Sequence, residues 1–311
     1  MITVTGSLAF DHIMNYPGRF SDHIMPGKIH QINLSFLVNT LSKQKGGTAG
    51  NIAYNLALLN IPVGILGMAG IDFLEYAKFL ANAGVDISQI QTAENNLTSS
   101  AFIMTDSSDN QITAFYPGAM EYANKLSLAK VKTDFAVISP NNPEAMVNLT
   151  REAQQKRIPF MLDPGMQLPA LNPDNLRGML KEAAILIGND YEISLLKEKV
   201  SLDEAGLLDN IEVLITTLGE KGSLIQTKDQ NIQITAGKVS KAIDPTGAGD
   251  AYRAGFLAGY LKNLDLKTCG QMGSVTACYA VEKYGTTNHK FSIIEFCERY
   301  KQNFGEELKL S

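Results

Sequence analysis

An aspartate that directly follows a glycine-rich turn is the residue of this 311-residue chain best placed to do chemistry. Asp250 comes after Thr246-Gly247-Ala248-Gly249, and good helix formers continue from there. A helix N-terminus offers unpaired N–H groups at the positive end of its dipole, and small residues let an anion approach them. We therefore expect the N–H groups of Gly247, Ala248 and Gly249 to hold negative charge while Asp250 takes a proton from a hydroxyl group. The alternative is that Asp250 only caps the first turn.

Polar residues also follow the first predicted strand. The β-branched run 2–5 predicts a strand that ends at Gly6-Ser7, and Asp11 follows shortly after. An acidic residue at the carboxyl end of a strand fits the ligand-binding edge of an α/β sheet. A plain turn aspartate is the alternative from the residues alone.

A second glycine turn precedes an amphipathic helix that is predicted over 52–59. Gly46 and Gly47 lead into Thr48-Ala49-Gly50-Asn51, so a ligand could approach the backbone closely there. An ordinary loop and helix cap would produce the same pattern.

Two strand ends in the second half carry further polar groups. Asn189 and Glu192 lie three residues apart and would share one face of a helical turn, where a capping arrangement is the alternative. Thr217, Gly219 and Gly222 form a turn after another strand.

The order of the predicted elements indicates an α/β fold with a mostly parallel sheet and helices on both faces. We predict strands at 2–5, 63–68, 135–139, 159–162, 184–187 and 213–217, and helices at 73–83, 144–156, 175–183, 191–197 and 270–283. No repeat, low-complexity segment or linker interrupts the chain, so residues 1–311 are expected to form a single domain.

Two segments fall outside this alternation. Residues 13–41 contain turns and short alternating runs such as 29–34, and residues 99–105 and 111–116 read as a hairpin. Residues 13–41 fit a small antiparallel sheet, and we predict that segments 13–41 and 99–116 together form one small β-sheet lid. Such a sheet has little core of its own, so closing over a site or pairing with a second copy would stabilise it.

The run Asp244-Pro245-Thr246-Gly247-Ala248-Gly249-Asp250 resembles the C-terminal signature of the ribokinase-like (PfkB) carbohydrate and nucleoside kinases. Asp11, the stretch 46–51 and the stretch 189–192 match further motifs of the family in the same order. The resemblance covers nearly the whole chain. It implies a three-layer α/β/α fold, ATP as phosphoryl donor and a β lid over the sugar site.

The resemblance also implies roles for single residues. Asp250 would be the base and the turn Gly247–Gly249 the anion hole; Asp11, Gly47 and Asn51, with Ser7 and Gly46 beside them, would bind sugar hydroxyls. Glu192 would bind Mg²⁺ through water. Residues that would bind the nucleotide are Asn189, Thr217, Gly219, Gly222 and Asn288. A monovalent cation is left open, because the Ser that helps to bind it in many members has no clear counterpart here.

Three stretches resemble the prokaryotic nucleoside/adenosine kinase branch of this family: 6–11, 112–116, and 243–246 with 252–256. Phe115 could offer a flat surface to a purine, and a place in the lid core or in a dimer contact is the alternative for this residue. Adenosine is the expected substrate. A ribokinase or fructokinase is the alternative, and a non-catalytic sugar- or nucleotide-binding protein on the same fold is a second. A dinucleotide-binding fingerprint would need glycine at the position of Tyr252.

Composition excludes some partners. The net charge of −5 gives no basic surface for nucleic acid, and no run of ~18 apolar residues predicts a membrane span. The N-terminus has no signal-peptide pattern. Three cysteines without metal or disulfide spacing suit a reducing cytoplasm. We therefore expect a cytoplasmic enzyme with small-molecule substrates, and a homodimer formed through the lid.

Overall fold

The main β-sheet runs through the centre of the molecule. The structure is a computed structural model that describes residues 1–24, 27, 33–108 and 110–310. In these residues the sheet has nine strands in the order β13-β12-β11-β10-β9-β8-β1-β4-β5. They are β1 (Ile2–Thr5), β4 (Val63–Ala69), β5 (Ile90–Thr92), β8 (Phe135–Ile138), β9 (Phe160–Leu162), β10 (Ala183–Asn189), β11 (Ile211–Thr217), β12 (Ser223–Gln226) and β13 (Asn231–Ile234). The β11–β12 and β12–β13 pairs are antiparallel and the other pairs are parallel, so the carboxyl ends of all these strands except β12 meet at one edge.

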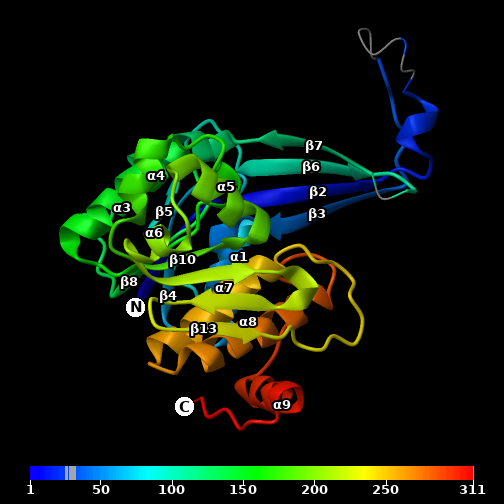
Figure 1. The fold of residues 1–311 in the computed structure, drawn as a ribbon. Helices are drawn as coiled ribbons and strands as arrows, with labels where there is room; N and C mark the ends of the chain where they lie inside the picture. The colour runs from blue at the N-terminus through cyan, green and yellow to red at the C-terminus, as the bar shows by residue number, and fades with distance from the viewer. Residues whose placement is uncertain (25–26, 28–32, 109, 311) are drawn as a thin grey trace.

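Helices cover both faces of this sheet (Figure 1). One apolar core joins the sheet to α3 (Pro143–Lys156), α4 (Pro173–Leu180), α5 (Asp190–Val200) and α6 (Glu204–Leu208). The other core joins it to α1 (Thr48–Leu58), α2 (Leu74–Asn82), α7 (Ala248–Leu261), α8 (Leu266–Val281) and α9 (Ile293–Phe304). The central strands β1, β4, β8 and β9 are buried on both faces, as the predicted three-layer arrangement requires.

A second sheet projects from the body (Figure 1). It has the strand order β3-β2-β6-β7, made by β2 (Ala9–Asn15), β3 (Thr40–Gly46), β6 (Ser99–Thr105) and β7 (Gln111–Tyr116). The bounds of β6 and β7 confirm the predicted hairpin. The predicted lid segment 13–41 contains only the end of one strand, β2 (9–15), and the start of another, β3 (40–46).

The lid is a mixed sheet: the β2–β3 and β6–β7 pairs are antiparallel, whereas β2 and β6 pair parallel. Between β2 and β3 the described residues include a short 3₁₀ helix, Phe20–Asp22. Most of the run 29–34 lies outside the described residues. The strands form at the base of the lid because backbone hydrogen-bonding partners are available there. Strand β2 pairs with β3 on one side and with β6 on the other.

Candidate active site

Asp250 lies at the start of α7, as predicted. Gly247 is the N-cap residue and has φ of 80°, a left-handed conformation that glycine adopts without strain. The side chain of Asp250 is partly buried, and its Oδ2 accepts a hydrogen bond of 2.8 Å from Asn51 Nδ2. Burial raises the pKa of Asp250 to about 6, while Arg253 and the bond from Asn51 act in the opposite direction. A carboxylate with such a pKa is suited to accept a proton near neutral pH.

The N–H groups of the turn are not all available. Ala248 donates its N–H to the Pro245 carbonyl at 3.1 Å, whereas in the described part of the chain the N–H groups of Gly247, Gly249 and Asp250 have no backbone acceptor. In this structure the Ala248 N–H closes the turn, and the role expected for it is not tested. The donors left for an anion are those of its neighbours.

Helix α1 brings Asn51 to this turn. Asn51 is 3% exposed, and its Oδ1 is buried without a hydrogen-bond partner in the structure. A buried acceptor without a partner costs free energy, so a ligand hydroxyl that donates to it would be bound favourably. Gly47 starts this helix at φ of 89°, and a Cβ there would lie 2.5 Å from the Ser7 carbonyl oxygen. Glycine is thus required by the close approach of the two loops.

Asp11 lies on β2 at the base of the lid. Burial, together with the charge of Asp244, raises the pKa of Asp11 to about 6. The carboxylate of Asp11 packs against Gly46, where any side chain would collide with it. Asp11 also influences the pKa of Asp250, so the two carboxylates share one region. Ser7 Oγ accepts the Thr48 N–H at 3.1 Å, which joins the loop after β1 to the start of α1.

The pair Asn189 and Glu192 forms a capping box at the start of α5. Asn189 Oδ1 accepts the Glu192 N–H at 2.8 Å, and Glu192 Oε2 accepts the Asn189 N–H at 2.8 Å. The capping alternative is therefore present in the structure. The Glu192 carboxylate nevertheless lies close enough to Asp163 and Arg253 to influence the pKa of both.

The residues predicted to line the nucleotide have structural partners of their own. Thr217 ends β11, next to Asn189 on β10, and Gly219 is exposed. Gly222 is buried with φ of 92°, and a Cβ there would collide with the backbone of β13. Asn288 donates to Gln44 of the lid at 3.0 Å and to the Tyr284 carbonyl at 2.7 Å. Asn288 therefore connects the body to the lid.

Phe115 lies on the same face of the lid as Asp11. Asp11 pairs with Ala101, and Ala101 pairs with Phe115, so the three side chains form one row across β2, β6 and β7. Gln44, which pairs with Asp11 on β3, contacts Asn288 of the body from this face. Phe115 is 45% exposed, which leaves its ring free to contact a ligand.

Three charged residues near the site were not singled out by the sequence. Asp244 accepts the N–H groups of Thr246 (2.9 Å) and Gly285 (3.0 Å), and so fixes the turn before α7. Arg253 of α7 forms an ion pair of 2.6 Å with Asp163, which follows β9. An arginine between buried helix residues could have signalled a buried partner, but the sequence does not identify that partner.

The acidic residues near the site could bind a magnesium ion only if water molecules and the phosphates of a ligand supplied most of its coordination. Among the described residues, no group of three or more His, Cys, Asp or Glu side chains is placed to hold a metal ion. Glu192 and Asp163 lie close enough for the charge of Glu192 to raise the pKa of Asp163. One or two carboxylates together with waters and phosphates are what Mg²⁺ usually takes, so this donor set fits it.

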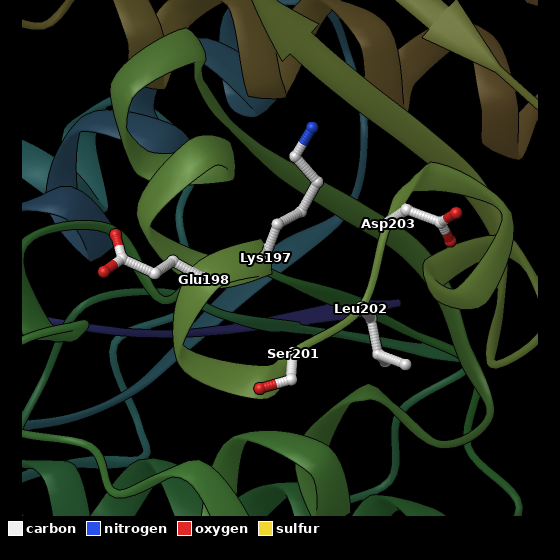
Figure 2. Close-up of a pocket in the computed structure, with 5 residues that line it drawn as sticks. All are labelled: Lys197, Glu198, Ser201, Leu202 and Asp203. Carbon is white, nitrogen blue, oxygen red and sulfur yellow. The ribbon is translucent and has the colours of Figure 1, made fainter.

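A shallow hollow on the surface lies away from these residues. It is lined by Lys197, Glu198, Ser201, Leu202 and Asp203, at the end of α5 and in the turn that follows. Figure 2 shows their side chains pointing in different directions. Lys197 is paired with Glu204 of α6 at 2.5 Å. This hollow contains no residue of the predicted site.

Comparison with known proteins decides the family. Residues 4–292 match the pfkB family carbohydrate kinases. This chain belongs to that family. As a member of it, the protein is a kinase. No helix among the described residues is long and apolar enough to cross a membrane.

The chain is similar to two nucleoside kinases over nearly its whole length. It is 34% identical over 286 residues to the nucleoside kinase of Methanocaldococcus jannaschii, covering 91% of each chain. The structure of Burkholderia thailandensis nucleoside kinase in complex with inosine matches with a TM-score of 0.88 at 34% identity, covering 99% of each chain. The complex of that protein with ADP-inosine matches with a TM-score of 0.86. The expected ribokinase-like fold is thus confirmed.

Proposed function

We propose that this kinase transfers the γ-phosphoryl group of ATP to the 5′-hydroxyl group of a nucleoside, with adenosine preferred. The similarity to two nucleoside kinases supports the nucleoside class, and the ADP-inosine complex of one of them supports a purine nucleoside and an adenine nucleotide. The preference for adenosine over other purines rests on the resemblance of stretches 6–11, 112–116, and 243–246 with 252–256 to the nucleoside/adenosine kinase branch.

One observation carries the proposal: Asp11 and Phe115 lie in one row on the site-facing side of the lid, two strand spacings apart. Two spacings are about 10 Å, which suits a ligand with a sugar at one end and a flat base at the other. Hydroxyls of the ribose would donate to Asp11 and to the unpartnered Oδ1 of Asn51. A free sugar would leave Phe115 without a contact.

The residues of the turn supply the remaining chemistry. Asp250, held by Asn51, accepts the proton of the attacking 5′-hydroxyl group. The N–H groups of Gly247, Gly249 and Asp250 stabilise negative charge on the phosphoryl group during transfer. Asn189, Thr217, Gly219 and Gly222 form the adjoining strand ends, where the nucleotide would lie.

Magnesium bound to the phosphates would neutralise charge on them, and Glu192, with Asp163 nearby, would hold its water ligands. The monovalent cation remains outside the proposal, because the Ser that helps to bind it in many family members has no clear counterpart in this sequence. We place the enzyme in the cytoplasm, since the described cysteines Cys269, Cys278 and Cys297 are all free.

The outer face of the lid fits a second copy of this chain. Leu41, Met14, Met104 and Ile112 pair in one row across all four strands, on the face opposite Asp11. Leu41 is 67% and Ile112 is 45% exposed. A thin sheet with an apolar outer row is stabilised by a like sheet packed against it. Light scattering should show a dimer that Met104→Lys converts to monomer; a wild-type monomer would remove this part of the proposal.

The experiment that tests the function is a panel of acceptors, with ADP release as the readout. Adenosine, inosine, cytidine, ribose and fructose are compared by kcat/KM with ATP in excess. We expect adenosine first and inosine next, with the free sugars far below. Phosphorylation of ribose or fructose with none of the nucleosides would reject the nucleoside proposal and favour the sugar kinase alternative. No turnover with any acceptor would favour the binding-protein alternative.

A further inference from the structure

A buried ion pair lies beneath the catalytic turn. Arg253 Nε and Asp163 Oδ2 are 2.6 Å apart, and the two side chains are only 9% and 2% exposed. Replacing such a pair by apolar side chains of similar size is often neutral or stabilising. Stability alone therefore does not account for a charged pair at this position.

The position of Arg253 connects it to the turn. Arg253 is three residues after Asp250 on α7, so the two share one face of the helix. A Cβ at Gly249 would lie 2.8 Å from Arg253 Nη1, so the guanidinium packs directly against the backbone of the turn. Asp163, which directly follows β9, holds the guanidinium through the ion pair.

Arg253 is the positive member of a group of carboxylates. Asp163 from β9 and Asp11 from β2 both act on Asp250 as like charges, and Glu192 from α5 acts on Asp163 and Arg253. Asn51 of α1 contributes a neutral donor to Asp250. Without the guanidinium, a partly buried Asp250 would be surrounded by like charge and would take up a proton at neutral pH.

We propose that Arg253 is a positioning residue that holds the turn at Gly249 in place and keeps Asp250 ionised, and that Asp163 anchors Arg253. The inference rests on the proposed role of Asp250 as the base. Arg253 itself contacts no reacting atom. It acts through the charge it places behind Asp250 and through its packing against Gly249.

The test uses the pH dependence of two variants with opposite expected signs. Arg253→Met removes the positive charge. It should move the acid limb of the pH profile of kcat to a higher pH, by about 1–3 pH units. Asp163→Asn keeps the shape and removes a negative charge, so its acid limb should move slightly downward while kcat falls. Arg253→Lys keeps the positive charge, so it should move the acid limb of the pH profile back toward the wild-type position. It should not restore full kcat, because lysine lacks the planar guanidinium group of arginine.

A matched control comes from Arg299, which pairs with Glu282 at 2.7 Å near α9 and is also largely buried. Arg299→Met removes a comparable ion pair far along the chain from the turn. Its acid limb should match the wild type even if the protein becomes less stable. An unmoved limb in Arg253→Met, or the same direction of movement in Arg253→Met and Asp163→Asn, would overturn the inference.

A second readout needs no turnover. Urea unfolding of wild type and Asp250→Asn between pH 4 and 9 gives the pKa of Asp250 from the pH dependence of their difference. The same comparison in the Arg253→Met background should give a pKa that is higher by about 1–3. An identical pKa in both backgrounds would reject the inference. Since this measurement is independent of the acceptor, failure of the nucleoside proposal would be seen separately, in the acceptor panel.

Discussion

Replacing Asp250 by Asn should abolish most of the activity and, at neutral pH, stabilise the fold. Asparagine keeps the size of the side chain and can still accept the hydrogen bond from Asn51 Nδ2. It cannot accept a proton from the hydroxyl group. Loss of a positioned general base lowers kcat by about 10²–10⁴-fold, so we expect a loss in that range with ATP binding retained.

The expected change in stability follows from the pKa. Burial raises the pKa of Asp250 from 3.8 to about 6, so the folded protein binds this proton more tightly than the unfolded chain. The free energy of unfolding therefore falls as pH rises from about 4 to about 6 and stays lower above that range. A tenfold difference in proton affinity between the folded and unfolded states corresponds to about 1.4 kcal/mol, and the partial exposure of the side chain reduces the effect. We expect Asp250→Asn to gain about 1–3 kcal/mol at pH 8 relative to its effect at pH 4.

The assay pairs steady-state kinetics with urea unfolding at pH 4, 6 and 8. Asp174→Asn is a suitable control, because Asp174 forms an exposed ion pair with Arg177 and should change neither quantity by much. Near wild-type kcat in Asp250→Asn would refute its role as the base. A stability difference that does not change between pH 4 and pH 8 would refute the raised pKa.

Three further predictions concern the acceptor side of the site. Asp11→Ala should raise the KM for the acceptor by about 5–150-fold, with a much smaller effect on the KM for ATP, because it leaves hydroxyl groups unpaired; equal effects on both would contradict its assignment. Phe115→Ala should raise the KM for adenosine by about 5–150-fold, the usual range for loss of a stacked base, and leave any ribose turnover unchanged; an unaltered adenosine KM would place the ring outside the site. Hydrogen exchange over 99–105 and 111–116 should slow when adenosine binds, and unchanged exchange in both strands would argue against lid closure.

The parts predicted from sequence are those encoded by contiguous residues. The turn and helix at Gly247–Asp250 were predictable because glycine, the small residues and the aspartate occur in one run. The hairpin of β6 and β7 was predictable because a polar loop separates two β-rich runs. The central βαβ order followed for the same reason, with most boundaries within a few residues of those observed.

The parts not predicted depend on contacts between distant residues. The parallel pairing of β2 with β6 brings together segments that nothing local connects. The ion pair of Arg253 with Asp163 is likewise set by the position of α7 over β9. The strands β12 and β13 were missed because two of the four residues in each are polar, so neither shows the continuous β-branched or apolar run that marks β1 and β8. The hydrogen bond from the Ala248 N–H to the Pro245 carbonyl depends on the geometry of the turn, which composition does not specify.

The central claim is that this chain phosphorylates a nucleoside by means of Asp250. Its most direct test is ADP release with adenosine, inosine or ribose as acceptor, measured for wild type and Asp250→Asn under the same conditions. We predict a higher kcat/KM for adenosine than for ribose in wild type and a loss of about 10²–10⁴-fold in kcat in the variant. Turnover of ribose without turnover of either nucleoside, or full activity of the variant, would contradict it.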